Sequence, residues 1–141
     1  MEAPASLSQG RPNPPGRARP LVLLVEDQQA LRQLYARELT LAGFDVIEAG
    51  NGLAGVDAST RHIPDLVLMD LSLPVLDGWE ATRRIKTDAR TAHIPVMALT
   101  GHDTAGELER ATRAGCNWFI PKPCPPGALV AEVRRLLATQ S

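Results

Sequence analysis

Two stretches of the chain, residues 21–25 and 66–69, are uninterrupted apolar runs in which hydrophobic side chains do not alternate with polar ones. This pattern is typical of strands that are covered on both faces, as in the centre of a parallel sheet. Residues 96–100 predict a further buried strand, and residues 117–120 predict a fifth strand. The alternating residues 44–49 predict a less buried strand, nearer a sheet edge.

Segments with helical periodicity separate the strands. They are residues 28–42, 53–61, 79–86 and 104–114, followed by a last helix that opens at Pro125 and Pro126 and carries Leu129, Val133, Leu136 and Leu137 on one stripe. Strands that alternate with helices predict an α/β fold. We expect a doubly wound, five-stranded parallel sheet, with right-handed crossovers that place helices on both faces.

The first predicted helix shows one apolar stripe. Its members, expected to face the core, are Leu31, Leu34, Tyr35 and Leu41. Arg32, Gln33 and Arg37 are expected on the opposite side. Gly43 follows the helix and favours its termination there, because glycine readily adopts the left-handed conformation of a helix end.

Polar side chains stand where four of the predicted strands end. Glu26 and Asp27 follow the first strand, Asp70 follows the third, Thr100 ends the fourth and Lys122 comes soon after the fifth. Carboxyl ends of parallel strands meet at one edge of the sheet, where open α/β sheets place their ligand sites. We therefore expect these side chains to gather at that edge.

Such a gathering of acids predicts a bound cation. Two carboxylates about 4 Å apart repel by roughly 4 kcal/mol at an effective dielectric constant of about 20. A site built from carboxylate oxygens alone favours a hard ion, and a shallow site with few protein ligands suits Mg²⁺. With a cation, the Lys122 charge and the Thr100 hydroxyl, the set meets the needs of phosphoryl transfer onto a carboxylate. Asp70, alone at its strand end, is the best candidate nucleophile.

A second motif points to a different chemistry. Residues 50–55 match the G-x-G-x-x-G dinucleotide fingerprint, with Asp70 twenty residues beyond Gly50. That fingerprint belongs at the first strand-to-helix turn, which here carries Glu26 and Asp27 and would repel a pyrophosphate. We interpret the glycines as a tight turn with close helix packing.

Composition limits the class of protein. The 141 residues, 44% hydrophobic but only 4% aromatic, fit one soluble domain with an aliphatic core at residues 21–141, preceded by a disordered Pro- and Arg-rich tail at residues 1–20. A net charge of -1 argues against nucleic-acid binding, and no apolar run approaches the roughly 20 residues of a membrane span. Cys116 and Cys124 are expected to be reduced thiols in a cytoplasmic protein.

From residue 21 to about residue 137, the chain resembles the response-regulator receiver family, the CheY-like phosphoacceptor domains. The residues that carry the resemblance are Leu24-Val25-Glu26-Asp27, Asn51-Gly52, residues 69–78, Ala98-Leu99-Thr100 and Lys122-Pro123. The resemblance implies a flavodoxin-like (βα)5 fold with the strand order 2-1-3-4-5.

The resemblance also implies roles for residues at the sheet edge. Asp70 would accept the phosphoryl group and Asp27 would bind Mg²⁺ directly. Glu26 would act in the metal site through water, and the backbone carbonyl of Ser72 would complete the site.

Three further residues would contact the phosphoryl group or respond to it. Lys122 would contact the phosphoryl group, and the Lys122-Pro123 bond after it would be cis. Thr100 would be the switch hydroxyl. Phe119 would be the rotating aromatic residue, in place of the family's frequent tyrosine. Phosphorylation would then change the surface formed by the fourth helix, fifth strand and fifth helix.

By the same resemblance, the phosphodonor would be a sensor histidine kinase or a histidine phosphotransfer protein, and a downstream target protein would read the signal. The sequence ends soon after the last predicted helix. We therefore expect a stand-alone receiver, a monomer or weak dimer, that catalyses its own phosphorylation and dephosphorylation but is not a conventional enzyme. The main alternative is a receiver-like adaptor whose contacts do not depend on phosphorylation. A hydrolase that uses the same acids lacks a water-activating base.

Overall fold

The computed structural model describes residues 18–73, 75–101 and 105–139. Residues 1–17 of the predicted tail therefore lie outside the described residues. Close to the start of the described residues, the guanidinium of Arg19 donates hydrogen bonds to the backbone carbonyls of Thr40 at 2.8 Å and Gly43 at 3.0 Å. The described chain is thus attached to the end of the first helix before the first strand starts.

Five parallel strands form a single sheet. They are β1 (Leu21–Val25), β2 (Asp45–Ala49), β3 (Leu66–Asp70), β4 (Val96–Thr100) and β5 (Trp118–Pro121). Their order is β2-β1-β3-β4-β5, which confirms the predicted topology. The apolar strands β1 and β3 lie inside the sheet and the alternating strand β2 lies at its edge, as their patterns predicted.

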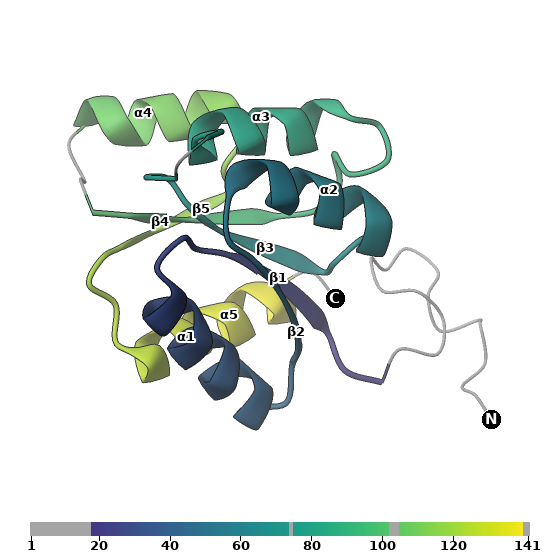
Figure 1. Ribbon diagram of the computed structural model, residues 1–141, viewed down its shortest axis with the longest axis vertical. Coiled ribbons are helices and arrows are strands. Elements are labelled where there is room, and N and C mark those ends of the chain that lie inside the picture. The colour runs from purple at the N-terminus through teal and green to yellow at the C-terminus, as the bar shows by residue number, and fades with distance from the viewer. Residues whose placement is uncertain (1–17, 74, 102–104, 140–141) are drawn as a thin grey trace.

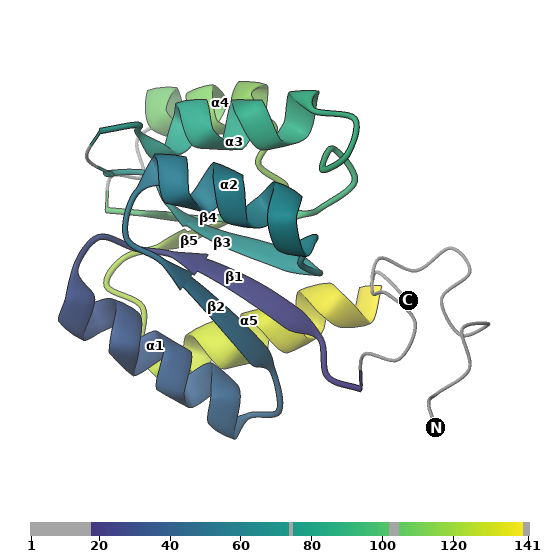
Figure 2. The same cartoon turned by 45° about the vertical axis from the view of Figure 1, so that its right-hand side comes forward.

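Helices cover both faces of the sheet, which confirms the doubly wound fold (Figure 1). They are α1 (Gln29–Leu41), α2 (Gly52–His62), α3 (Gly78–Thr87), α4 (Ala105–Ala114) and α5 (Pro126–Thr139). Helices α1 and α5 lie on one face and α2, α3 and α4 on the other, an arrangement that Figure 2 shows from a second direction. The predicted start of the fourth helix at Thr104 lies outside the described residues.

The two faces of the sheet pack two separate layers of the core. In β1, Val22 and Leu24 join the layer beneath α1 and α5, whereas Leu23 and Val25 join the layer beneath the other three helices. All four side chains are completely buried. Strands buried on both faces leave no polar positions until they end, and so the first polar side chains occur at the carboxyl edge.

The structure corrects the predicted face of α1. Leu34 and Leu41 are exposed by 44% and 72%, whereas Leu39 is buried together with Tyr35 and Ala36. The buried face follows a spacing of four residues from Leu31, which leaves Leu34 and Leu41 on the outer side. The helix stops as predicted, with Gly43 at a positive φ of 108°.

Two glycines of the G-x-G-x-x-G motif are explained by close packing, as interpreted from the sequence. A Cβ atom on Gly55 would lie 2.9 Å from Cγ2 of Val25, and one on Gly52 would lie 2.9 Å from the carbonyl carbon of Leu76. Both distances are far below normal carbon contacts. Helix α2 can therefore approach β1 and the β3–α3 loop only because these positions lack side chains.

Val75, in the loop between β3 and α3, adopts φ 70° and is 80% exposed. This backbone region costs a β-branched residue on the order of 1–2 kcal/mol, whereas asparagine tolerates it. We expect Val75→Asn to raise the free energy of unfolding by about 1 kcal/mol in urea denaturation. Val75→Ile, which keeps the branched side chain, should leave it unchanged, and equal stabilities of all three proteins would contradict the explanation.

Cys116 and Cys124 are free and buried, and burial raises the pKa of the Cys116 thiol to about 11. Among the described helices, none combines the length and the apolar character that a bilayer crossing requires.

Candidate functional site

The predicted site residues gather at the carboxyl edge of the sheet. Glu26 and Asp27 directly follow β1, Asp70 ends β3, Thr100 ends β4 and Lys122 follows β5. Parallel pairing places Asp70 opposite Leu99, one residue before Thr100, so neighbouring strands end at the same level. The alignment of the strand ends brings residues that are nearly one hundred positions apart in the sequence to one place.

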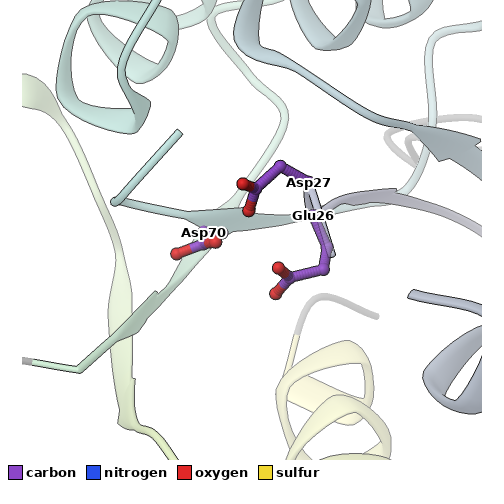
Figure 3. Close-up of side chains that lie close together, drawn as sticks. All are labelled: Glu26, Asp27 and Asp70. Atoms are coloured by element: carbon purple, nitrogen blue, oxygen red, sulfur yellow. The ribbon is translucent and has the colours of Figure 1, made fainter. Parts of the chain in front are cut away.

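Glu26, Asp27 and Asp70 form a cluster of three carboxylates, here called the acidic site. One oxygen from each lies within 4.8 Å of the others. The carboxylates of Glu26 and Asp27 approach Asp70 from consecutive positions after β1 (Figure 3). Glu26 is completely buried and Asp70 is 2% exposed, whereas Asp27 is exposed. Two of the three carboxylates are therefore buried, and the third is open to solvent.

Lys122 lies on the inner side of the acidic site. Its ammonium nitrogen is 3.0 Å from Oε1 of Glu26 and 3.5 Å from Oδ2 of Asp70. The side chain is 19% exposed, so water screens these charges only partly. One cation thus compensates part of the charge of two buried carboxylates, while Asp27 adds a third negative charge at the entrance.

The environment shifts the pKa values of the two partners. Burial raises the pKa of Glu26, and the negative charge of Asp70 adds to this, although the Gln28 N–H and the Lys122 ammonium oppose it. For Lys122, burial alone would lower the pKa, but the combined attraction of Glu26 and Asp70 outweighs it and raises the pKa. Lys122 therefore keeps its positive charge beside the buried carboxylate of Glu26.

Backbone contacts fix the loop that follows Asp70. The Ser72 N–H donates to Oδ1 of Asp70 at 3.0 Å, and the Gly78 N–H donates to the Leu71 carbonyl at 3.2 Å. Asp77 caps α3 by accepting a hydrogen bond from the Glu80 N–H at 2.8 Å. The start of α3 is thus tied to the residue after Asp70, and Ser72, predicted to lend a carbonyl to a metal, lies beside the carboxylate.

The predicted switch residues flank the site. Thr100 is 3% exposed, and its carbonyl accepts a hydrogen bond from the Lys122 N–H at 2.7 Å. Phe119 lies in β5 opposite Ala98, is partly buried, and packs against the core layer beneath α2, α3 and α4. The Lys122-Pro123 bond is cis, as the resemblance implied.

The sequence did not reveal two residues of α1 that contact this site. Arg32, predicted to lie opposite the core-facing stripe, donates to the Glu26 carbonyl at 2.8 Å. Tyr35, predicted to be an ordinary core residue, donates its hydroxyl hydrogen to the Cys124 carbonyl at 2.7 Å. An arginine at the start of the helix was the only signal for the first contact. No sequence signal indicated the second, because its partners are far apart along the chain.

The donor set of the acidic site fits a magnesium ion. Three carboxylates offer oxygen ligands, the described residues around them contribute no imidazole or thiolate, and the exposed side at Asp27 leaves room for water. Mg²⁺ prefers such oxygen ligands and retains several waters. One carboxylate oxygen from each of the three residues is therefore already close enough to the others to take part in one metal site.

We therefore expect Mg²⁺ to stabilise the fold and Asp27→Asn to remove most of that effect. A ligand at about 100 times its Kd adds about 2.7 kcal/mol to the free energy of unfolding. Thermal unfolding with and without MgCl2 measures the difference. Asp57→Asn, which changes an exposed acid of α2, is the matched control and should respond like the unaltered chain. An undiminished Mg²⁺ response in Asp27→Asn would contradict this assignment.

Comparison with known proteins agrees with this geometry. The family model described as the response regulator receiver domain matches residues 22–134. The polar-differentiation response regulator DivK of Brucella anthropi is 34% identical over 116 residues, which cover 82% of this chain and 94% of DivK. Residues 22–134, which the family model matches, include every candidate site residue.

Solved structures show the same fold. The chemotaxis protein CheY4 of Vibrio cholerae superposes with a TM-score of 0.80 at 24% identity, covering 84% of this chain and 98% of CheY4. The receiver domain of the sensor histidine kinase PA1611 from Pseudomonas aeruginosa, solved with a magnesium ion coordinated in the active site cleft, is 33% identical, with a TM-score of 0.71. That comparison covers 87% of this chain and 98% of the PA1611 domain.

Proposed function

Because the chain belongs to the response regulator receiver domain family and therefore to two-component signalling, we propose that it takes a phosphoryl group from a partner phosphohistidine onto Asp70. The observation that carries the proposal is the acidic site with Lys122 against its inner side. The donor is a sensor histidine kinase or a histidine phosphotransfer protein.

In the proposed reaction, a carboxylate oxygen of Asp70 forms a bond to phosphorus while the bond from phosphorus to the histidine nitrogen breaks. The imidazole leaves with the bonding electron pair, and the product is an aspartyl phosphate. The Lys122 ammonium, 3.5 Å from Oδ2 of Asp70, is placed to attract the phosphoryl oxygens. The Thr100 hydroxyl, at the neighbouring strand end, is the second candidate contact.

The proposed cofactor is Mg²⁺, which neutralises charge on the transferring phosphoryl oxygens when bound. The PA1611 receiver domain binds magnesium in its cleft, and this chain offers carboxylate oxygens of Glu26, Asp27 and Asp70 within 4.8 Å of one another. We propose that Asp27 binds the ion directly, Glu26 through water and Ser72 through its backbone carbonyl.

The proposed output is a change of the surface formed by α4, β5 and α5. Thr100 moves toward the phosphoryl group, Phe119 changes its rotamer, and a separate target protein in the cytoplasm reads the new surface. The chain promotes its own phosphorylation and dephosphorylation but turns over no other substrate, so it is a phosphoacceptor and not a conventional enzyme.

A test uses phosphoramidate as donor, because its phosphorus–nitrogen bond stands in for that of phosphohistidine. With MgCl2 we expect the intact chain to gain one phosphoryl group and to change its amide hydrogen exchange in α4, β5 and α5. Failure to gain the group would contradict the proposed transfer. A gain without a change in exchange would contradict the proposed output and favour an adaptor whose contacts do not depend on phosphorylation.

A further inference from the structure

Two side chains of helix α1 donate hydrogen bonds to the two loops that carry site residues, one after β1 and one after β5. Arg32 holds the loop that carries the two acids, and Tyr35 holds the loop that follows Lys122. We propose that Arg32 and Tyr35 are positioning residues, the first for the metal ligands and the second for the lysine. The proposal rests on the proposed function, since it concerns the same phosphoryl-transfer site.

The guanidinium of Arg32 joins three parts of the carboxyl edge. It donates to the Glu26 carbonyl at 2.8 Å and to Oε1 of Glu48, near the end of β2, at 3.1 Å. Its terminal nitrogen also lies so close to Gly50 that a Cβ there would be 3.3 Å away. The arginine is 18% exposed, so it is packed into this junction and not free in solvent.

The hydrogen bond from Arg32 to the Glu26 carbonyl constrains the direction of the Asp27 side chain. The backbone of Glu26 is fixed on one side by its own N–H, which donates to the Ala49 carbonyl at 3.0 Å, and on the other by Arg32. Asp27 begins at the peptide whose carbonyl Arg32 holds. Because the Asp27 side chain is exposed, its aim toward Asp70 depends on this backbone.

Tyr35 acts on the opposite side of the site. Its ring is 1% exposed, and its hydroxyl donates to the carbonyl of Cys124, two residues after Lys122. The Lys122 N–H is fixed from the β4 side by the Thr100 carbonyl. The loop that carries the lysine is therefore held at two points, one in the sheet and one in α1.

The two contacts predict separable effects. Loss of the two hydrogen bonds that Arg32 donates should loosen the metal ligands and leave Lys122 in place. Loss of the Tyr35 hydroxyl should loosen the lysine loop and leave the acids in place. Two groups that hold catalytic parts in this way affect the reaction through geometry, to which phosphoryl transfer is sensitive.

The experiment compares Arg32→Lys with Tyr35→Phe. Lysine keeps the charge but cannot bridge two acceptors in a fixed plane, and phenylalanine keeps the ring. Isothermal titration calorimetry gives the Kd for Mg²⁺, and intact mass with phosphoramidate gives the phosphorylation rate at saturating Mg²⁺. We expect Arg32→Lys to raise the Kd about tenfold with little change in that rate, and Tyr35→Phe to lower the rate about tenfold with an unchanged Kd.

Matched controls separate positioning from a general loss of stability. Arg37→Lys makes the same change at an exposed position of α1. Ser59→Ala removes a fully buried hydroxyl that bonds within α2. Both controls should keep the Kd and the rate of the unaltered chain.

Three results would contradict either the proposed phosphoryl transfer or the positioning roles of Arg32 and Tyr35, and they can be told apart. If the unaltered chain gains no phosphoryl group, the proposed function fails and the Tyr35 inference fails with it, while the Mg²⁺ titration still tests Arg32. If the unaltered chain reacts and both variants match the controls, only the positioning inference fails. If each variant changes the Kd and the rate together, in proportion to its loss of thermal stability, the two residues are merely structural.

Discussion

Gly78→Ala is expected to lower the free energy of unfolding by about 3 kcal/mol. Gly78 opens α3 directly behind Asp70. A Cβ there would lie 2.6 Å from Cα of Leu71 and 3.0 Å from the carbonyl carbon of Asp70, and it would overlap the Asp70 carbonyl oxygen. All of these are backbone atoms, which cannot move away as a flexible side chain could.

The same substitution should also weaken the site. The backbone of Gly78 must shift away from Asp70 and Leu71 to admit the methyl group, and the Gly78 N–H would then lose its bond to the Leu71 carbonyl. Urea denaturation measures the stability, and calorimetry with MgCl2 measures the site. Gly127→Ala is the control, because an added Cβ at this exposed position of α5 would have no atom within 4 Å other than those of its own neighbouring helix backbone. It should be neutral or slightly stabilising. Equal stabilities of the two variants would contradict the close packing at Gly78.

Chelation of divalent cations is expected to slow phosphorylation of Asp70 by more than about 100-fold, since a metal ion contributes several kcal/mol of charge stabilisation in such reactions. In this chain, the charge of the acidic site makes stabilisation by a metal ion especially important. An incoming phosphoryl group approaches three carboxylates, and among the described residues only the Lys122 ammonium forms ion pairs within that cluster. Without the ion, repulsion opposes the approach of the donor.

The rate is measured by intact mass after addition of phosphoramidate, with EDTA or with excess MgCl2. A third sample in NaCl of matched ionic strength controls for general screening of charge, and should react as slowly as the EDTA sample. Restoring MgCl2 to the chelated sample should restore the rate. A rate in EDTA within a factor of about three of the rate in MgCl2 would contradict a metal-dependent site.

The sequence was sufficient to predict the sheet and the position of the acidic site. Apolar strands without alternation can only be central, and a polar side chain at the end of such a strand has only the carboxyl edge to occupy. Glu26 and Asp70 were predictable for this reason. Lys122 was predictable because it follows β5, whose carboxyl end lies at the same side of the parallel sheet. The fold places them, so their position does not depend on fine detail of side-chain packing.

Features that depend on tertiary contacts were not predictable in this way. The stripe of α1 could be drawn through Leu34 or through Leu39, and only the packing against the sheet and α5 decides for Leu39. The bond from Tyr35 to Cys124 joins residues 89 positions apart, and predicting it requires knowledge of how α1 meets the loop between β5 and α5. The requirement for glycine at position 78 likewise arises from the backbone of another segment.

If Asp70 is the phosphoacceptor, direct mapping of the modified residue should identify position 70. The chain is treated with phosphoramidate and MgCl2 and then with sodium borohydride, which reduces an aspartyl phosphate to homoserine, and its peptides are analysed by mass spectrometry. We predict homoserine at position 70 in the unaltered chain and no phosphoryl group on Asp70→Asn. Modification at another residue, or an adduct that persists in Asp70→Asn, would contradict the account.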